Sequence, residues 1–271
     1  MMRLRNEGPI GVFDSGPGGL RVLAALSKRL PQEDFVYLAD TARHPYGTRG
    51  KQTIFNYCHA CARALREHRI KLLVLTSHTA SAVAQERLAA ELFMPVVGAI
   101  APGLQAAVAT GASRIGVLTS AYLSRSGDHA RTLVELGAQA GLRTQNSQLL
   151  CALPEEGVWD GELVQLAVRQ QLAPLIESKV QAVVLGESPL SALHAAVSSE
   201  LAANGGVQVV DGTERMVENV VQVVEARQLA TARTEPGKLR VVFSDPPADL
   251  SIAEHFLGHS LAGITVTSVD L

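Results

Sequence analysis

Short runs rich in β-branched residues alternate with longer helical patterns along the whole of this 271-residue chain. This alternation constrains the fold most, because apolar strands that alternate with helices form parallel sheets covered by helices on both faces. The helical patterns have apolar residues three and four positions apart, as in Leu20–Leu30, Thr53–His68, Ala80–Leu92 and Leu163–Ile176. The expected strands are Ile10–Phe13, Phe35–Leu38, Leu72–Leu75, Val96–Gly98, Ile115–Leu118, Gln148–Ala152, Ala182–Leu185, Val207–Val210, Leu239–Phe243 and Ile264–Val269.

Ten strands are many for one open sheet, which favours two α/β units. The two halves also echo each other, because Leu72–Ser77 and Ala182–Glu187 both read as a strand followed by a turn and a helix. The polar stretch Thr231–Lys238 is typical of a surface connection. We therefore expect an α/β protein with two open parallel sheets.

Composition excludes several classes of protein. Hydrophobic residues make up 47% of the chain, which is too many for a disordered protein. Lys and Arg number 24 against 26 Asp and Glu, so no basic excess favours nucleic acid as a partner. No apolar run approaches the roughly 20 residues of a membrane helix, and the first residues lack a signal-peptide core. We expect no membrane association and a cytoplasmic location.

In open parallel sheets, ligands bind beyond the carboxyl ends of the strands, where the N-termini of helices offer unpaired N–H groups. The residues that follow the expected strands are therefore the candidates for a site. These segments are Asp14–Gly19, Asp40–Gly47, Ser77–Ser81, Thr119–Ser120, Glu187–Pro189 and Asp211–Thr213.

Each of these motifs also has a purely structural interpretation. Gly16–Gly19 is a poor dinucleotide fingerprint, since Arg21 stands where a third glycine belongs, and a tight turn explains it as well. Ser77 with its neighbouring hydroxyl residues is typical of a helix N-cap, and His78 of a packing residue. Ser188 lies in an incomplete nucleophile elbow that has Leu190 in place of the second glycine.

The three cysteines, Cys58, Cys61 and Cys151, are too few for a disulfide framework. Cys58 and Cys61 have C-x-x-C spacing, but they lie inside a helical pattern with no second pair. We expect no disulfide and no metal at these two residues, because a pair on one helix face does not complete a four-ligand zinc site.

Taken together, the motifs resemble the glutamate racemase family of the aspartate/glutamate racemase superfamily. The resemblance runs over nearly the whole chain, and its segments stand in the family's order. These segments are Ile10–Leu20, Tyr37–Gly47, Thr79–Ala82, Pro95–Gly103, Arg114–Leu118, Asp211–Glu214 and a C-terminal pattern with Ser244–Asp245 and Leu257–Gly258.

The resemblance implies two pseudo-symmetric, flavodoxin-like α/β domains that hold a small acidic amino acid between them. The first domain would be residues 1–99 plus 211–271, and the second residues 100–210. It also implies that no cofactor is used and that two cysteines, one on each face of the substrate, exchange the α-proton. Racemisation needs a base on one face and an acid on the other, because an α-proton beside a carboxylate is a very weak acid.

The sequence departs from the family at both cysteine positions. The first falls on Ser77, with His78 in place of the family's asparagine, and the second falls on Glu187. Pro189 stands where the family has a histidine, and none of the chain's three cysteines maps near either position. Serine is a far weaker acid than cysteine, whose thiol has a pKa near 8.5. A carboxylate with a raised pKa can transfer protons, but Glu187 would also repel an acidic substrate.

Three hypotheses remain open. The first is an enzyme with altered cofactor-independent proton chemistry, an isomerase or a lyase, that epimerises, decarboxylates or eliminates a small amino or carboxylic acid. The second is a catalytically silent relative that binds a ligand or a protein partner, and the third is a glutamate racemase without thiols. A homodimer is left open.

The candidate residues fall into two sets. Those proposed to handle protons are Ser77, Glu187, His78 and Asp14. Those proposed to bind the substrate are Ser15, Pro45, Tyr46, Gly47, Thr79, Ser120 and Ser188, and no metal ligands are expected. We expect Ser77 and Glu187 to face each other across one cleft.

Overall fold

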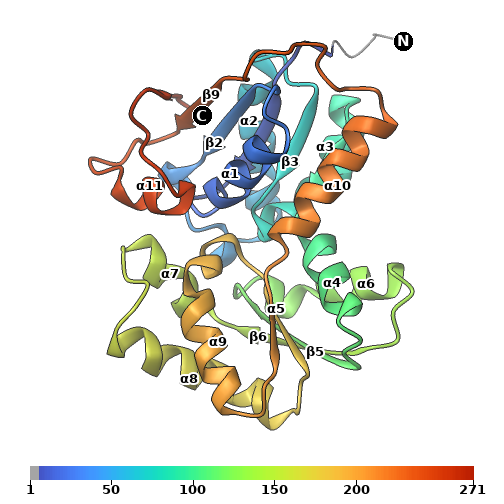
Figure 1. Ribbon diagram of the computed structural model, residues 1–271, viewed down its shortest axis with the longest axis vertical. Helices are drawn as coiled ribbons and strands as arrows, with labels where there is room; N and C mark the ends of the chain where they lie inside the picture. Colours follow the sequence, from blue (N-terminus) through green and yellow to red (C-terminus); the bar gives the residue numbers. More distant parts are fainter. Residues whose placement is uncertain (1–5) are drawn as a thin grey trace. The chain divides into compact units, whose positions relative to one another are not determined.

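Two fully parallel sheets organise residues 6–271, which are the residues that the computed structural model describes (Figure 1). The chain divides into two compact units, one formed by residues up to Gly98 together with Met216–Leu271, and the other by Ala99–Arg215. Each unit contains one of the sheets. The α/β class with two parallel sheets, expected from the sequence, is therefore confirmed.

The sheet of the first unit has six strands in the order β10-β9-β2-β1-β3-β4. Its central strands are buried along their whole length, as their continuous apolar sequences require. The strands are β1 (Ile10–Asp14), β2 (Phe35–Ala39), β3 (Leu72–Leu75), β4 (Val96–Gly98), β9 (Leu239–Phe243) and β10 (Thr265–Ser268).

Helices cover both faces of this sheet. Helix α1 (Leu20–Arg29) packs against α11 (Ser251–Leu257), and Figure 1 shows α1 in front of the sheet. Helices α2 (Lys51–Glu67) and α3 (His78–Leu92) pack together, and right-handed crossovers place them on the face opposite α1. Two short 3₁₀ turns, η1 (Thr41–Arg43) and η2 (Tyr46–Thr48), follow β2.

The second unit has a four-stranded sheet in the order β6-β5-β7-β8. Helices α4 and α6 pack together beside this sheet, while α7, α8 and α9 pack on its apolar core with the turn η3. The strands are β5 (Arg114–Thr119), β6 (Gly141–Asn146), β7 (Ala182–Leu185) and β8 (Gln208–Val210). The helices are α4 (Ile100–Ala109), α5 (Leu123–Ser126), α6 (Asp128–Glu135), α7 (Gln148–Glu155), α8 (Glu162–Glu177), η3 (Ser188–Leu193) and α9 (His194–Ala203).

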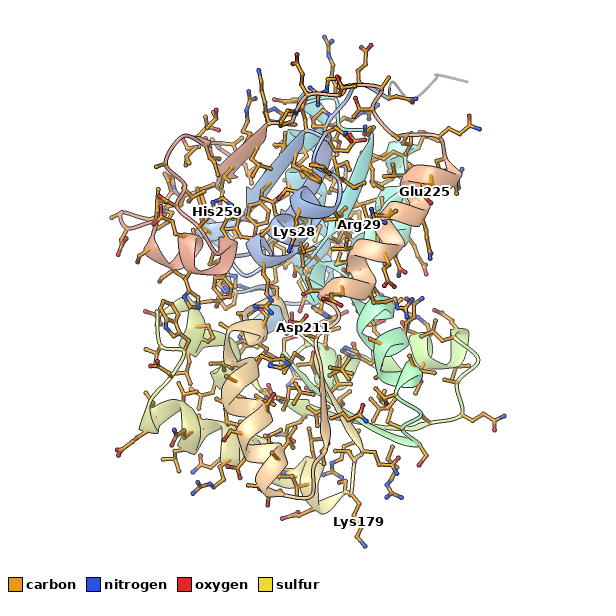
Figure 2. All side chains as sticks on the ribbon, viewed as in Figure 1. Lys28, Arg29, Lys179, Asp211, Glu225 and His259 are labelled. Atoms are coloured by element: carbon orange, nitrogen blue, oxygen red, sulfur yellow. The ribbon has the colours of Figure 1, made fainter. Side chains whose placement is uncertain are left out.

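The two sheets share a topology. The order β2-β1-β3-β4 in the first unit matches β6-β5-β7-β8 in the second, and β9 and β10 extend only the first sheet. In both sheets the strand order reverses beside the unit's first strand, between β1 and β3 and between β5 and β7. Such switch points are where open α/β sheets bind ligands. Figure 2 labels Asp211, which follows β8 and precedes α10 (Thr213–Ala226), the helix within which the chain returns to the first unit.

In the second unit, one expected strand is wrong and one strand was missed. Gln148–Ala152 was expected to be a strand, but it begins helix α7, because Leu150, Cys151 and Leu153 pack as one helix face on the core while Leu149 is exposed. The strand in this region is instead β6, Gly141–Asn146, which the sequence analysis missed. This strand is polar and only partly buried at the sheet edge, so it lacks the apolar run that marks a buried strand.

At the amino ends of the strands in the first unit, a buried ion pair fixes two segments. Lys71 and Glu33 form a hydrogen-bonded ion pair, and the Lys71 side chain is only 1% exposed. The Lys71 ammonium group also donates to the carbonyl of Asn6 at 2.8 Å, and Glu33 accepts from the Thr231 N–H at 2.8 Å. The polar connection that follows α10 is thereby tied to the sheet.

Candidate functional site

The switch point of the first unit brings together the ends of β1 and β3. The Asp14 carboxylate accepts from the Gly16 N–H at 3.1 Å through Oδ1 and from the Thr76 hydroxyl at 2.7 Å through Oδ2. Gly19 makes this arrangement possible, because a Cβ atom there would lie 2.2 Å from Thr76 Oγ1 and 2.6 Å from Asp14 Oδ2. Asp14 is therefore a buried hydrogen-bonding hub at the start of α1.

Ser77 is the N-cap of α3. Its hydroxyl oxygen accepts from the Ala80 N–H at 3.2 Å, and its carbonyl accepts from the Ser81 hydroxyl at 2.8 Å. His78 and Thr79 follow as the first residues of the helix, and both are buried. A serine hydroxyl has one O–H donor and two acceptor lone pairs, so the O–H hydrogen and one lone pair of Ser77 are not used by this cap.

The segment after β2 is held by a carboxylate to which the sequence analysis gave no individual role. Asp40 is fully buried, and its Oδ2 accepts from the Tyr46 hydroxyl and from Arg43 Nε at 2.7 Å. Burial and the neighbouring thiols and carboxylate raise the pKa of the Tyr46 phenol far above its usual value. The Tyr46 side chain thus points into the protein, and the turn η2 packs against α3.

The switch point of the second unit brings together the ends of β5 and β7. Glu187 follows β7, is only 8% exposed, and accepts from the Ser120 N–H at 3.3 Å through Oε1. The Thr119 hydroxyl donates to the Gly186 carbonyl at 3.2 Å, which closes the same gap between the strands. Ser188 begins the turn η3 directly after Glu187.

A buried histidine lies behind this second switch point. His129 on α6 is 1% exposed, and neither ring nitrogen has a hydrogen-bond partner within residues 6–271. A Cβ atom placed on Gly186 would lie 3.5 Å from His129 Nε2, so the imidazole packs against the end of β7. Burial lowers its pKa to about 4, and the nearby Asp128 offsets only part of this effect.

The three cysteines are buried free thiols. Burial raises the pKa of all three, and the carboxylates of Glu187 and Glu155 add to the effect at Cys151. A thiol therefore lies within electrostatic range of Glu187, although no cysteine maps near that position in sequence. It is kept protonated inside the apolar core. No metal-binding cluster of three His, Cys, Asp or Glu side chains was found among the residues described.

The structure gathers the sequence-predicted residues into two groups. Asp14, Ser15, Ser77, His78, Thr79 and the Pro45–Gly47 turn lie at the carboxyl edge of the first sheet, and Ser120, Glu187 and Ser188 lie at that of the second. Since the groups belong to different units, the facing of Ser77 and Glu187 stays a prediction. Sequence reasoning missed Thr76, Asp40 and His129. The first two lay beside or within segments that it had selected, but His129 carried no motif.

Comparison with known proteins gives consistent results over the chain. The family model described as Asp/Glu/hydantoin racemase matches residues 19–220. The glutamate racemase of Geobacter metallireducens is 36% identical over 263 residues, which cover 96% of this chain and 97% of that protein. The glutamate racemase of Neisseria meningitidis serogroup A is 34% identical and covers 99% of this chain and 100% of its own length.

Solved structures show the same fold. A glutamate racemase isoform of Bacillus anthracis superposes with a TM-score of 0.90 and 26% identity, covering 98% of this chain and 99% of that one. The glutamate racemase of Thermus thermophilus, solved in complex with β-chloro-D-alanine, superposes with a TM-score of 0.86 and 30% identity. That comparison covers 98% of each chain.

Proposed function

The chain belongs to the glutamate racemase family of Asp/Glu racemases, and we propose that it binds a small amino or carboxylic acid and carries out altered, cofactor-independent proton chemistry on it. The reaction would be an epimerisation, a decarboxylation or an elimination. The observation that carries the proposal is the chemistry of the two switch points, where a serine follows β3 and a glutamate follows β7. These are the positions at which the family resemblance implies cysteines.

The first switch point is suited to an anion. The N-termini of α1 and α3 meet there, and a helix N-terminus attracts negative charge through its unpaired N–H groups and its dipole. Ser15, Ser77 and Thr79 add hydroxyl groups at the same edge. We propose that this edge binds the carboxylate that every ligand of this class carries.

Ser77 would serve as a hydrogen-bond donor and not as a base. A serine hydroxyl is not appreciably ionised near neutral pH, and the Ser77 oxygen already accepts the Ala80 N–H. His78, the next residue, is the neighbouring group on this edge that could exchange a proton. Asp14 is less suited to this role because Gly16 and Thr76 already donate to its oxygens.

Glu187 would be the proton-transferring group of the second switch point. Its carboxylate is nearly buried and is oriented by the Ser120 N–H, as a general base needs to be. If ionised, it would repel a second carboxylate of the substrate by about 4 kcal/mol at a separation of about 4 Å and an effective dielectric of about 20. We therefore propose a substrate with a single carboxylate and a neutral or basic side chain. The Thermus thermophilus relative was solved with β-chloro-D-alanine, which is a monocarboxylate, and this supports a substrate of similar size.

A second candidate function is a catalytically silent protein that binds such an acid. The cap hydrogen bond of Ser77 and the satisfied oxygens of Asp14 favour it, because both groups are occupied in structural roles.

A homodimer also remains a prediction, which light scattering of the purified protein would decide.

The test is hydrogen exchange at the α-carbon in heavy water. A panel of D- and L-amino acids and small hydroxy acids is incubated with the protein and followed by NMR. We expect α-hydrogen exchange on at least one monocarboxylate, and we expect its rate to fall at least 100-fold in Glu187→Gln. Glu155→Gln is the matched control, because this carboxylate lies on α7 in the same unit and should leave exchange unchanged. Binding without exchange across the panel would establish the silent alternative.

A further inference from the structure

The buried cluster around Asp40 contains more polar groups than packing alone explains. It joins the carboxylate of Asp40, the hydroxyl of Tyr46 and the guanidinium of Arg43 with the thiol of Cys61. All of these side chains lie in the first unit, between the end of β2 and helix α2. Asp40 Oδ2 accepts both donors, while Oδ1 has no hydrogen-bond partner among the described residues.

Asp40 is well placed to hold the segment that follows it. Its backbone N–H donates to the Asp14 carbonyl at 3.1 Å, and its backbone carbonyl accepts from the Arg43 N–H at 3.2 Å. The residue is thus fixed to the switch-point strand β1 on one side and to the turn η1 on the other. A buried carboxylate fixed in this way provides a rigid acceptor for the side chains that reach it.

The two side chains that donate to Asp40 also contact aromatic rings and a thiol. Arg43 also lies over the ring of Tyr57, with its Cζ atom 4.6 Å from the ring centroid, and Nη2 lies 3.5 Å from Cys61 Sγ. Burial lowers the pKa of Arg43, but the hydrogen bond and charge of Asp40 outweigh it and raise that pKa above its usual value. The Tyr46 ring packs against those of Phe13 and Tyr57 at centroid distances of 6.2 Å and 5.5 Å.

We propose that Asp40 is a positioning residue: by binding Arg43 and Tyr46, it directs both side chains inward and presents the turn from Pro45 to Gly47 to a ligand through its backbone alone. This inference rests on the proposed function for the existence of the ligand. It assigns the expected role of Tyr46 in substrate binding to the backbone of the turn and not to the phenol. The guanidinium of Arg43 and the hydroxyl of Tyr46 therefore do not contact the ligand.

The first test uses the ligand-free protein, so that it is independent of the proposed function. In Asp40→Asn, amide hydrogen exchange of peptides within residues 41–49 should accelerate at least tenfold, and labelling of Cys61 by a thiol reagent should rise in parallel. Asp34→Asn is the matched control. It removes a carboxylate at the opposite end of β2 that pairs with Arg233 at 2.8 Å, and it should leave residues 41–49 unchanged. Exchange of residues 41–49 within twofold of the wild type in Asp40→Asn would overturn the proposal.

The second test reports on the Tyr46 hydroxyl itself. The chain has four tyrosines, so labelling tyrosine with ¹³C at Cζ gives few NMR signals, and Tyr46→Phe identifies the one that belongs to Tyr46. We expect Asp40→Asn to shift that signal and Asp34→Asn to leave it in place. Tyr46→Phe keeps the ring packing, so it also serves if Asp40→Asn does not fold. In that variant the exchange of residues 41–49 should still accelerate, and an unchanged rate would overturn the proposal.

The third test joins the positioning role to ligand binding. β-Chloro-D-alanine is the probe, and its binding is followed by NMR line broadening. Asp40→Asn and Tyr46→Phe should each weaken this binding at least fivefold. The double variant should lose no more than the larger single loss, because either change alone already disrupts the hydrogen bond between Tyr46 and Asp40. Independent, multiplying losses would mean that Tyr46 contacts the probe directly, which would overturn the proposal. Failure of the wild type to bind any acid would count against the proposed function, while the two ligand-free tests would still decide the role of Asp40.

Discussion

His129 predicts a measurable dependence of stability on pH. Its imidazole is almost fully buried against Gly186, and its pKa is about 4 in the folded protein against about 6.5 in an unfolded chain. As the pH falls below about 6.5, this histidine therefore becomes protonated in the unfolded chain, whereas in the folded protein it stays neutral down to about pH 4. The folded state loses stability as the pH falls through this window, and below about pH 4 the loss is complete.

The size of the effect follows from the shift. A difference of about 2.5 pKa units at about 1.4 kcal/mol per unit gives a loss of about 3 kcal/mol between pH 7.5 and pH 4. His129→Leu removes the titration and keeps a side chain of similar size. Since neither ring nitrogen has a hydrogen-bond partner in the described part of the chain, the change costs no hydrogen bond. We expect the variant to be at least as stable as the wild type at pH 7.5 and clearly more stable at pH 4.5.

The assay is urea unfolding followed by circular dichroism at half-unit steps from pH 4 to pH 8. Hydrogen exchange of residues 114–135 assigns the change to the second unit. His259→Leu is the control, because this histidine is exposed and should leave the pH profile of the wild type unchanged. If the profiles of the wild type and His129→Leu run parallel between pH 6.5 and pH 4, the reasoning about His129 is refuted.

Two further predictions concern buried contacts of the first unit. Lys71→Met leaves the Glu33 carboxylate buried without its cation, so the free energy of unfolding should fall by about 3–5 kcal/mol in urea titrations. Adding Glu33→Gln should recover part of this loss. A loss below about 1 kcal/mol in Lys71→Met would refute the prediction. Gly19→Ala places a Cβ atom 2.2 Å from the Thr76 hydroxyl and should reduce binding of the acid at least tenfold. Gly50→Ala is its control, since nothing lies within 4 Å of the added atom, and equal effects of the two changes would contradict the role of Gly19.

Much of the fold could be predicted because the buried strands are nearly pure apolar runs. The apolar run around Val74 in β3, like the run around Val183 in β7, predicts a strand that is covered on both faces. The edge strand β6 could not be found in this way, because an edge strand that is half exposed needs no apolar run. The error at Gln148–Ala152 has a related cause, since a short apolar run fits a buried helix face as well as a strand.

The candidate site could be predicted only as far as motifs reach. Ser77 and Glu187 follow strands and were found for that reason, and the structure places both at switch points. The inward direction of Tyr46 depends on the acceptor that Asp40 provides, which the spacing of residues does not reveal. The burial of His129 depends on how α6 packs, and a single histidine in a sequence carries no sign of that packing.

Our central proposal is that Glu187 transfers a proton on a monocarboxylate, in place of the chemistry of a glutamate racemase. The most direct measurement compares α-hydrogen exchange of D- and L-glutamate with that of D- and L-alanine in heavy water at pH 7. The protein must come from a host that lacks its own racemases. A repulsion of about 4 kcal/mol corresponds to a discrimination of about 1000-fold, so we expect no detectable exchange or racemisation of glutamate, and faster exchange of alanine that is lost in Glu187→Gln. Robust racemisation of glutamate by the unmodified protein would contradict the account.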